Sequence, residues 1–217
     1  MNNQECIDKT VDFVKETLAG AESGHDRWHI YRVWKTAKEI ASKELVDILT
    51  VELWALLHDI ADSKFNNGDE EIGPQKARKH LESLQVEENI IVHVENIIKH
   101  ISFKGGNHQQ EFKSLELDVV QDADRLDALG AIWVARAFSY GGNKNREMWN
   151  PDIKPNIHMT KEEYKNSNES TINHFYEKLL LLKERMNTKT GKDMAHHRHE
   201  FMERYLEEFY KEREGKV

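Results

Sequence analysis

The sequence has a single cysteine, few prolines and no apolar run long enough to cross a membrane. Cys6 stands alone, which excludes an internal disulfide and a cysteine-rich metal site. Only 3 prolines and 11 glycines interrupt 217 residues, so long stretches lack a helix breaker. No apolar run approaches the ~20 residues of a membrane span, and the first residues, MNNQECIDKT, do not resemble a signal peptide. We therefore expect a soluble, cytoplasmic protein without membrane contact.

Positive charge is also scarce. The chain has 31 lysines and arginines against 39 aspartates and glutamates, which gives a formal net charge of −8. Binding of a nucleic-acid polymer requires clustered positive charge, so we expect no such partner. A small phosphorylated substrate remains possible, because a bound divalent cation can supply positive charge locally. The sequence does not indicate the oligomeric state.

Apolar residues recur at helical spacing along nearly the whole chain, and no strand pattern appears. Residues 48–61 are apolar almost all round, so we expect this helix to be central. The fold class is predicted to be all-α, as one helical bundle domain over residues 1–217. Helices are predicted up to Gly20 and over about 25–43, 48–61, 74–84, 87–101, 116–138 (broken near Gly130), 161–186 and 190–213.

Three segments between these helices carry loop signals. Residues 65–74, FNNGDEEIGP, and 102–113, SFKGGNHQQEFK, are predicted loops. Residues 139–160 contain the turn signals GGN, NP and KP, and are long enough for a lid or binding loop.

Several polar residues stand where core-facing residues are expected. Residues 53–62 read LWALLHDIAD, so His58 and Asp59 continue an apolar run. His29, His100 and the cluster Asp122/Asp124/Asp127 interrupt other apolar faces. Burying such groups is unfavourable unless something compensates them.

A divalent cation is the predicted compensation. Two imidazoles and two carboxylates form a ligand set for Mn²⁺, Fe²⁺, Co²⁺ or Zn²⁺, with positions left for water and substrate. Adjacent residues of a helix point about 100° apart, so His58 and Asp59 can share an ion only at a helix end or between helices.

Three motifs in this order resemble a known family. They are His29-Ile-Tyr-Arg32-Val33, LLHDIAD around His58, and QDADRLDALG around Asp124. The pattern resembles the HD-domain metal-dependent phosphohydrolase superfamily. More narrowly, it is similar to stand-alone bacterial HD hydrolases that include nucleotide pyrophosphohydrolases. The resemblance runs from about residue 20 to 150 and continues more weakly to the C-terminus. It implies an HD-type helical bundle with a metal-site core at about 20–140 and C-terminal helices, 161–213, packed on that core.

The resemblance implies a ligand set for one divalent ion. The matching positions are His29, His58, Asp59 and Asp124. Aligning ADRL with the family's A-D-x-L segment favours Asp124, and Asp122 remains the alternative. Manganese is the favoured ion among manganese, cobalt, iron, nickel, magnesium and zinc.

Asp59, His100, Lys104 and Arg32 are the expected catalytic residues, of which the resemblance implies the role of His100. Asp59 is expected to orient the nucleophile, and His100 to contact substrate or a second metal. A helix-end histidine favoured by the helix dipole is the alternative for His100. Lys104, in a Gly-containing loop, suits a phosphate contact, although surface lysines are common. Arg32 lies one turn after His29 and could pair with Asp59, Asp124 or a phosphate.

The implied activity is metal-assisted hydrolysis of a phosphoester or phosphoanhydride. The narrower resemblance favours a nucleoside triphosphate cut to monophosphate and pyrophosphate. Two alternatives remain: a diiron oxygenase of HD type, which needs more ligands, and a catalytically silent nucleotide-binding module. The complete ligand set argues against the silent module. A second HD dipeptide, His25–Asp26, is expected to start a helix, and the HHRH run at 196–199 to be exposed helix decoration.

Overall fold

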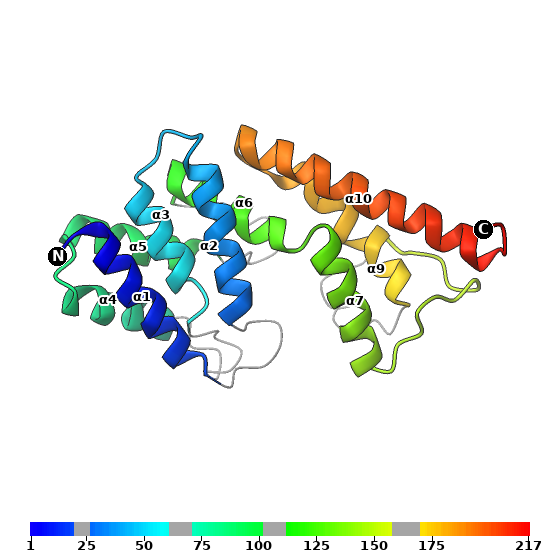
Figure 1. Cartoon of the computed structure of the whole chain (residues 1–217), viewed down its shortest axis with the longest axis horizontal. Coiled ribbons are helices and arrows are strands. Elements are labelled where there is room, and N and C mark those ends of the chain that lie inside the picture. The colour runs from blue at the N-terminus through cyan, green and yellow to red at the C-terminus, as the bar shows by residue number, and fades with distance from the viewer. Residues whose placement is uncertain (20–26, 61–70, 102–111, 158–169) are drawn as a thin grey trace. The chain divides into compact units, whose positions relative to one another are not determined.

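A computed structural model describes residues 1–19, 27–60, 71–101, 112–157 and 170–217 (Figure 1). These residues form helices and contain no strand, which confirms the all-α prediction. No helix within these ranges is both long and apolar enough to cross a membrane. The chain divides into two compact units, Met1–Asp124 and Arg125–Val217. A single domain over residues 1–217 stays a prediction.

The first unit is built around one helix. Helix α3 packs against α1, α2 and α5, and α4 packs against α5. The bounds are α1 (Asn3–Thr17), α2 (Arg27–Ala41), α3 (Ile48–Leu57), α4 (Ile72–Ser83), α5 (Glu88–Ile101) and α6 (Leu115–Asp127), whose last three residues belong to the second unit.

The sequence of α3 explains its central place. Every residue from Thr50 to Leu57 is buried. The Asp47 side chain accepts a hydrogen bond from the Thr50 backbone N–H at 2.6 Å and so caps the helix start. The helix ends at Leu57, earlier than predicted, and residues 58–60 form a turn. The predicted loop at 65–74 lies largely outside the described residues.

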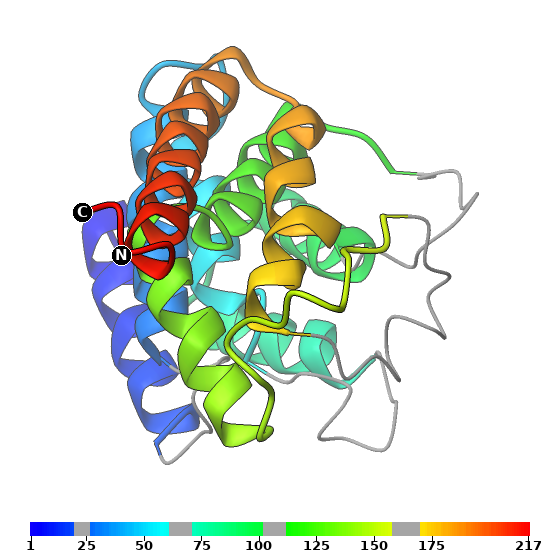
Figure 2. The ribbon, with the colours of Figure 1, turned by 90° about the vertical axis from the view of Figure 1, so that its right-hand side faces the viewer.

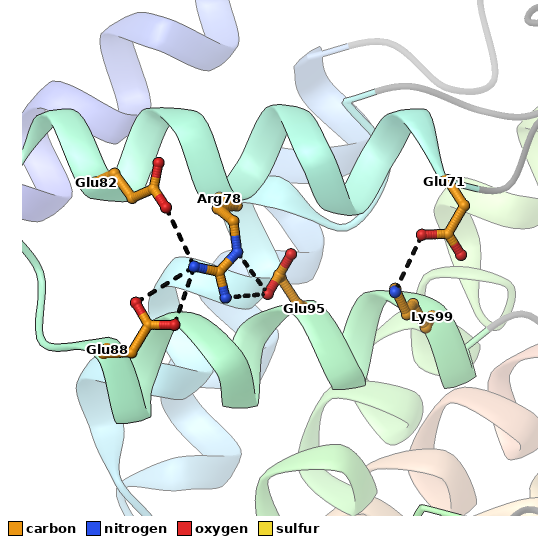
Figure 3. A network of polar contacts seen from close by, with 6 residues as sticks. All are labelled: Glu71, Arg78, Glu82, Glu88, Glu95 and Lys99. Carbon is orange, nitrogen blue, oxygen red and sulfur yellow. Dashed lines mark hydrogen bonds and ion pairs between the residues drawn. The ribbon is translucent and has the colours of Figure 1, made fainter.

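A charged network joins α4 to α5 (Figure 3). The Arg78 guanidinium donates to Glu95 at 2.9 Å, to Glu82 at 3.1 Å and to Glu88 at 3.0 Å. These hydrogen bonds, that to Glu95 first, raise the pKa of Arg78 above its ordinary value. Lys99 of α5 pairs with Glu71, which precedes α4, at 3.0 Å. The positive charges in the contacts between the two helices therefore come from Arg78 of α4 and Lys99 of α5.

The second unit contains three α-helices and a 3-10 helix within its described residues. Helix α10 packs against α7 and η2, and α7 packs against α9 (Figure 2). The bounds are α7 (Ala131–Asn143), α9 (Thr171–Glu177), η2 (Leu179–Arg185) and α10 (Lys189–Arg213). The predicted break near Gly130 is confirmed, because Gly130 lies between α6 and α7 with φ of 85°.

Two boundary predictions in this unit are wrong. The Gly141–Gly142 pair does not form a turn, because α7 continues through it to Asn143. A Cβ atom on Gly141 would lie 2.2 Å from the Thr171 hydroxyl oxygen, so this glycine permits a close approach of α9. The irregular segment therefore begins at Lys144, not at 139, and its role as a lid stays a prediction. The described part of the predicted helix 161–186 is interrupted at Lys178, where φ is −139° and ψ is −56°.

Candidate metal centre

His29 and His58 come from two helices that pack against each other. His29 lies on the buried face of α2, beside Ile30, and is 7% exposed. His58 is the residue that follows α3. Because α2 packs against α3, the imidazoles meet edge to face, with ring centroids 5.3 Å apart.

The hydrogen bonds of His58 determine which ring nitrogen faces His29. The His58 Nδ1 atom lies 2.8 Å from the carbonyl oxygen of Ala55, which can only accept, so Nδ1 carries the proton. In the neutral ring the lone pair is then on Nε2. This atom lies 3.3 Å from Nε2 of His29. Two facing lone pairs repel each other, so either a proton on His29 or a cation must lie between the two rings.

The spacing of these nitrogens fits a shared cation. Imidazole nitrogens bind first-row metals at about 2.1 Å, and two ligands at tetrahedral or octahedral angles then lie about 3.0 to 3.4 Å apart. The observed 3.3 Å falls in this range. The second imidazole nitrogen of His58 is held by a backbone carbonyl, as in many metal-ligating histidines.

One carboxylate belongs to the cluster, and a second lies beside His29. Ligand atoms of His29, His58 and Asp59 all lie within 4.8 Å of one another. The Asp124 Oδ1 atom, from α6, lies 3.5 Å from Nε2 of His29, and the Asp124 side chain is 41% exposed. Asp122, the alternative ligand, is fully buried. Two imidazoles and two carboxylates therefore come from α2, α6 and the turn that follows α3, all within Met1–Asp124.

The electrostatics keep His58 in the form that binds a metal. Burial lowers the pKa of His58, and the neighbouring His29 lowers it further. Asp59 and Asp124 act in the opposite direction, because their negative charge favours a positive ring. The balance leaves a neutral imidazole beside carboxylates, which attract a cation.

Of the other predicted site residues, the structure describes some and leaves others outside its described ranges. Arg32 lies on α2 one turn after His29 and is half-buried. The His100 Nδ1 atom donates to the Asn96 carbonyl at 2.7 Å, and the ring lies 5.6 Å from that of Phe112. This hydrogen bond agrees with the helix-end alternative and leaves Nε2 of His100 for a further contact. Lys104 and His25–Asp26 lie outside the described residues.

The HHRH run on α10 is only partly what we expected. His196 is exposed and pairs with Glu200 at 3.2 Å. His199, by contrast, is buried, with 6% of its surface exposed, so its assignment to exposed decoration is wrong.

Sequence reasoning missed one contact of His58. Trp54 lies one helical turn before it, and the two rings stack with centroids 4.9 Å apart and planes 24° apart. The spacing of four residues on a helix is the signal that could have revealed this pair.

Comparisons with known proteins agree with this architecture. The HD domain family matches residues 28–129, a range that includes His29, the His58–Asp59 doublet and Asp124. An HD-superfamily hydrolase from Bacillus thuringiensis has a crystal structure with a TM-score of 0.80. It is 44% identical, and the match covers 97% of this chain and 98% of that one.

A second relative is the uncharacterised protein YpgQ of Bacillus subtilis. It is 34% identical over 204 residues, which are 94% of this chain and 91% of YpgQ. The crystal structure of YpgQ in complex with ADP matches with a TM-score of 0.77 at 32% identity, covering 98% of this chain and 97% of that one. Both relatives match nearly end to end, and the HD family match begins one residue before His29 and ends beyond Asp124. This chain belongs to the HD superfamily.

Proposed function

We propose that the protein is a divalent-metal-dependent phosphohydrolase that acts on a nucleotide. The favoured reaction is hydrolysis of a nucleoside triphosphate to the monophosphate and pyrophosphate. Manganese is the favoured ion. The observation that carries this proposal is the 3.3 Å approach of the His29 and His58 Nε2 atoms beside two carboxylates.

Four residues are the proposed ligands of the ion. His29, His58, Asp59 and Asp124 together offer two neutral nitrogens and two anionic oxygens, which suits a divalent first-row metal. When bound, such a cation polarises a phosphoryl oxygen and lowers the pKa of a water molecule. Asp59 also has an oxygen to spare if it binds through one, and this oxygen can accept a proton from the attacking water and orient it.

Residues outside the ligand set recognise the phosphates. Arg32 lies one turn after His29 and so projects from the same side of α2. Its guanidinium suits a bidentate contact with phosphate. His100 can donate or accept through Nε2, since Nδ1 is held by Asn96. Lys104 is the third proposed phosphate contact. These groups would stabilise the negative charge that moves onto the leaving pyrophosphate.

The nucleotide part of the proposal has separate support. YpgQ, which this chain resembles over nearly its whole length, has been crystallised with ADP. In the proposed reaction a water oxygen attacks the α-phosphorus, and the bond from this phosphorus to the bridging oxygen breaks. Pyrophosphate leaves with the bridging oxygen. The choice of this bond rests on the resemblance to pyrophosphohydrolases.

A substrate panel tests this function. Nucleoside triphosphates, diphosphates, monophosphates and generic phosphoesters are assayed with Mn²⁺, Co²⁺, Mg²⁺, Zn²⁺ and Ni²⁺, with phosphate and pyrophosphate measured separately. We expect pyrophosphate release from a triphosphate in at least one metal. Release of phosphate alone would move the cleaved bond to the terminal phosphate, and no hydrolysis of any compound would contradict the proposal.

An Asp59→Ala variant tests the mechanism. The substitution is expected to abolish metal retention and turnover while the helical circular dichroism stays largely intact. Turnover that persists after the metal is lost would contradict the assigned mechanism.

A further inference from the structure

Trp54 forms a stacked pair with His58. It lies in α3, is 0% exposed, and its ring lies at a centroid distance of 4.9 Å and an angle of 24° to the imidazole. The four-residue spacing places the two side chains on the same face of the chain as it leaves α3. An aromatic ring therefore covers one face of a proposed ligand.

Two contacts together fix the imidazole. The Ala55 carbonyl holds the His58 Nδ1–H at 2.8 Å and so selects the tautomer. Trp54 holds the plane of the ring. Rotation of the imidazole out of this plane would break both contacts and turn Nε2 away from Nε2 of His29, which lies 3.3 Å away.

Filling of the core does not by itself explain a tryptophan at this position. The Trp54 indole N–H is buried and has no hydrogen-bond partner among the described residues. Burying an unpaired donor is unfavourable, and a phenylalanine would fill much of the same space without one. What tryptophan adds is a larger, electron-rich face, and this face lies on the imidazole of His58.

We propose that Trp54 is a positioning residue that holds the His58 ring in the orientation required to bind the cation. It acts through its stacking face and not through its N–H. The inference rests on the proposed metal site and adds a residue that lies outside the ligand set.

Cobalt binding tests this proposal. Co²⁺ is titrated into the purified protein, and both its affinity and its visible absorption spectrum, which reports ligand geometry, are measured. We expect Trp54→Leu and Trp54→Met to weaken Co²⁺ binding by about tenfold, as for other residues that orient metal ligands, and to shift the absorption bands. Methionine fills the core better than leucine and serves if the leucine variant does not fold. Trp54→Phe, which keeps an aromatic ring with a smaller face, is expected to weaken Co²⁺ binding less than either of these two variants.

Leu81→Ala is the matched control. Leu81 lies in α4 and is 0% exposed, so its truncation also creates a cavity in the first unit. It is expected to lower the midpoint of thermal unfolding without changing the Co²⁺ spectrum of the folded protein.

The experiment distinguishes failure of the role of Trp54 from failure of the proposed metal site. Wild-type Co²⁺ affinity and spectrum in the leucine and methionine variants would overturn the role of Trp54 while the metal site remains. Equal loss in the phenylalanine variant would overturn the role of the stacking face. If the wild-type protein bound neither Co²⁺ nor any other divalent ion, the metal site itself would be overturned.

Discussion

Burial lowers the pKa of two histidines whose charged neighbours have opposite signs. His58, in the unit Met1–Asp124, lies beside the carboxylates of Asp59 and Asp124. His174, in α9 of the unit Arg125–Val217, lies beside Lys178 and Arg146, and burial together with these cations lowers its pKa to about 4. The first environment attracts a divalent cation and the second repels it. A buried histidine alone therefore does not make a metal site, because the signs of the neighbouring charges decide.

The contacts between α4 and α5 provide a second contrast within the first unit. There the Arg78 guanidinium donates to three carboxylates, so the cluster already contains a cation (Figure 3). Between α2 and α3, two imidazole nitrogens face each other with carboxylates alongside. The arginine cluster explains how two helices are held together. The two facing nitrogens of the histidine cluster need either a proton on His29 or a cation between them, and the carboxylates alongside favour a cation.

The largest expected effect follows from removing the imidazole of His58. In a His58→Ala variant, metal retained after gel filtration should fall to background, and turnover with it, because one of the proposed ligands is lost. Elemental analysis and pyrophosphate release measure the two quantities. His196→Ala removes an imidazole whose side chain is 65% exposed and should change neither. Equal metal loss in both variants would place the ion elsewhere.

The next effect is the stabilisation that metal confers. A ligand that binds only the folded state at 100 times its dissociation constant raises the free energy of unfolding by about 2.7 kcal/mol. Urea unfolding with and without the metal should show this increase in the wild type and lose it in His58→Ala. Arg78→Gln should lower the stability at both metal concentrations and keep the increase. A reduced increase in Arg78→Gln would mean that the two clusters are coupled.

Much of the fold could be predicted because apolar periodicity reports burial directly. The eight buried residues Thr50–Leu57 gave a helix without a polar face, and Gly130 marked the break before α7. The turn predicted at Gly141 was wrong because glycine occurs both in turns and where two helices approach closely. A turn and a close approach between helices look alike in a sequence, and the approach of Thr171 belongs to the tertiary structure.

The candidate site was predictable in part for a different reason. His29, His58 and Asp59 follow from motifs and from the cost of burying polar groups. Asp122 and Asp124 could not be separated by chemistry, since both are carboxylates on one helix. In the structure Asp124 lies 3.5 Å from His29 and is 41% exposed, whereas Asp122 is fully buried.

The pH dependence of the free energy of unfolding tests the environment of His174. Its ordinary pKa of 6.5 applies to the unfolded chain, and burial lowers the pKa to about 4 in the folded protein. As the pH falls below about 6.5, the unfolded chain takes up the proton first. The stability present above this pH is lost progressively towards pH 4. The loss should reach about 2 kcal/mol at pH 5.

A His174→Gln variant isolates this contribution. Denaturant unfolding at pH 7.5 and pH 5 should show a smaller difference in the variant than in the wild type, by about 2 kcal/mol. His196→Gln, which alters an exposed side chain, should leave the pH dependence as it is. An unchanged pH dependence in His174→Gln would mean that His174 is not protected from protonation.

The smallest effects concern the helix contact that holds α9, and with it His174, in place. Alanine at Gly141 should lower the free energy of unfolding by at least about 1 kcal/mol, because its Cβ would lie 2.2 Å from the Thr171 hydroxyl oxygen. Alanine at Gly142, where no atom lies within 4 Å, should be neutral or stabilise the helix by up to about 1 kcal/mol. Thr171→Ala should restore part of the stability lost in Gly141→Ala, and a thermodynamic cycle measures this coupling. If both alanine variants were equally tolerated, α9 would not be held by close packing at this point. The burial that lowers the pKa of His174 would then need another cause.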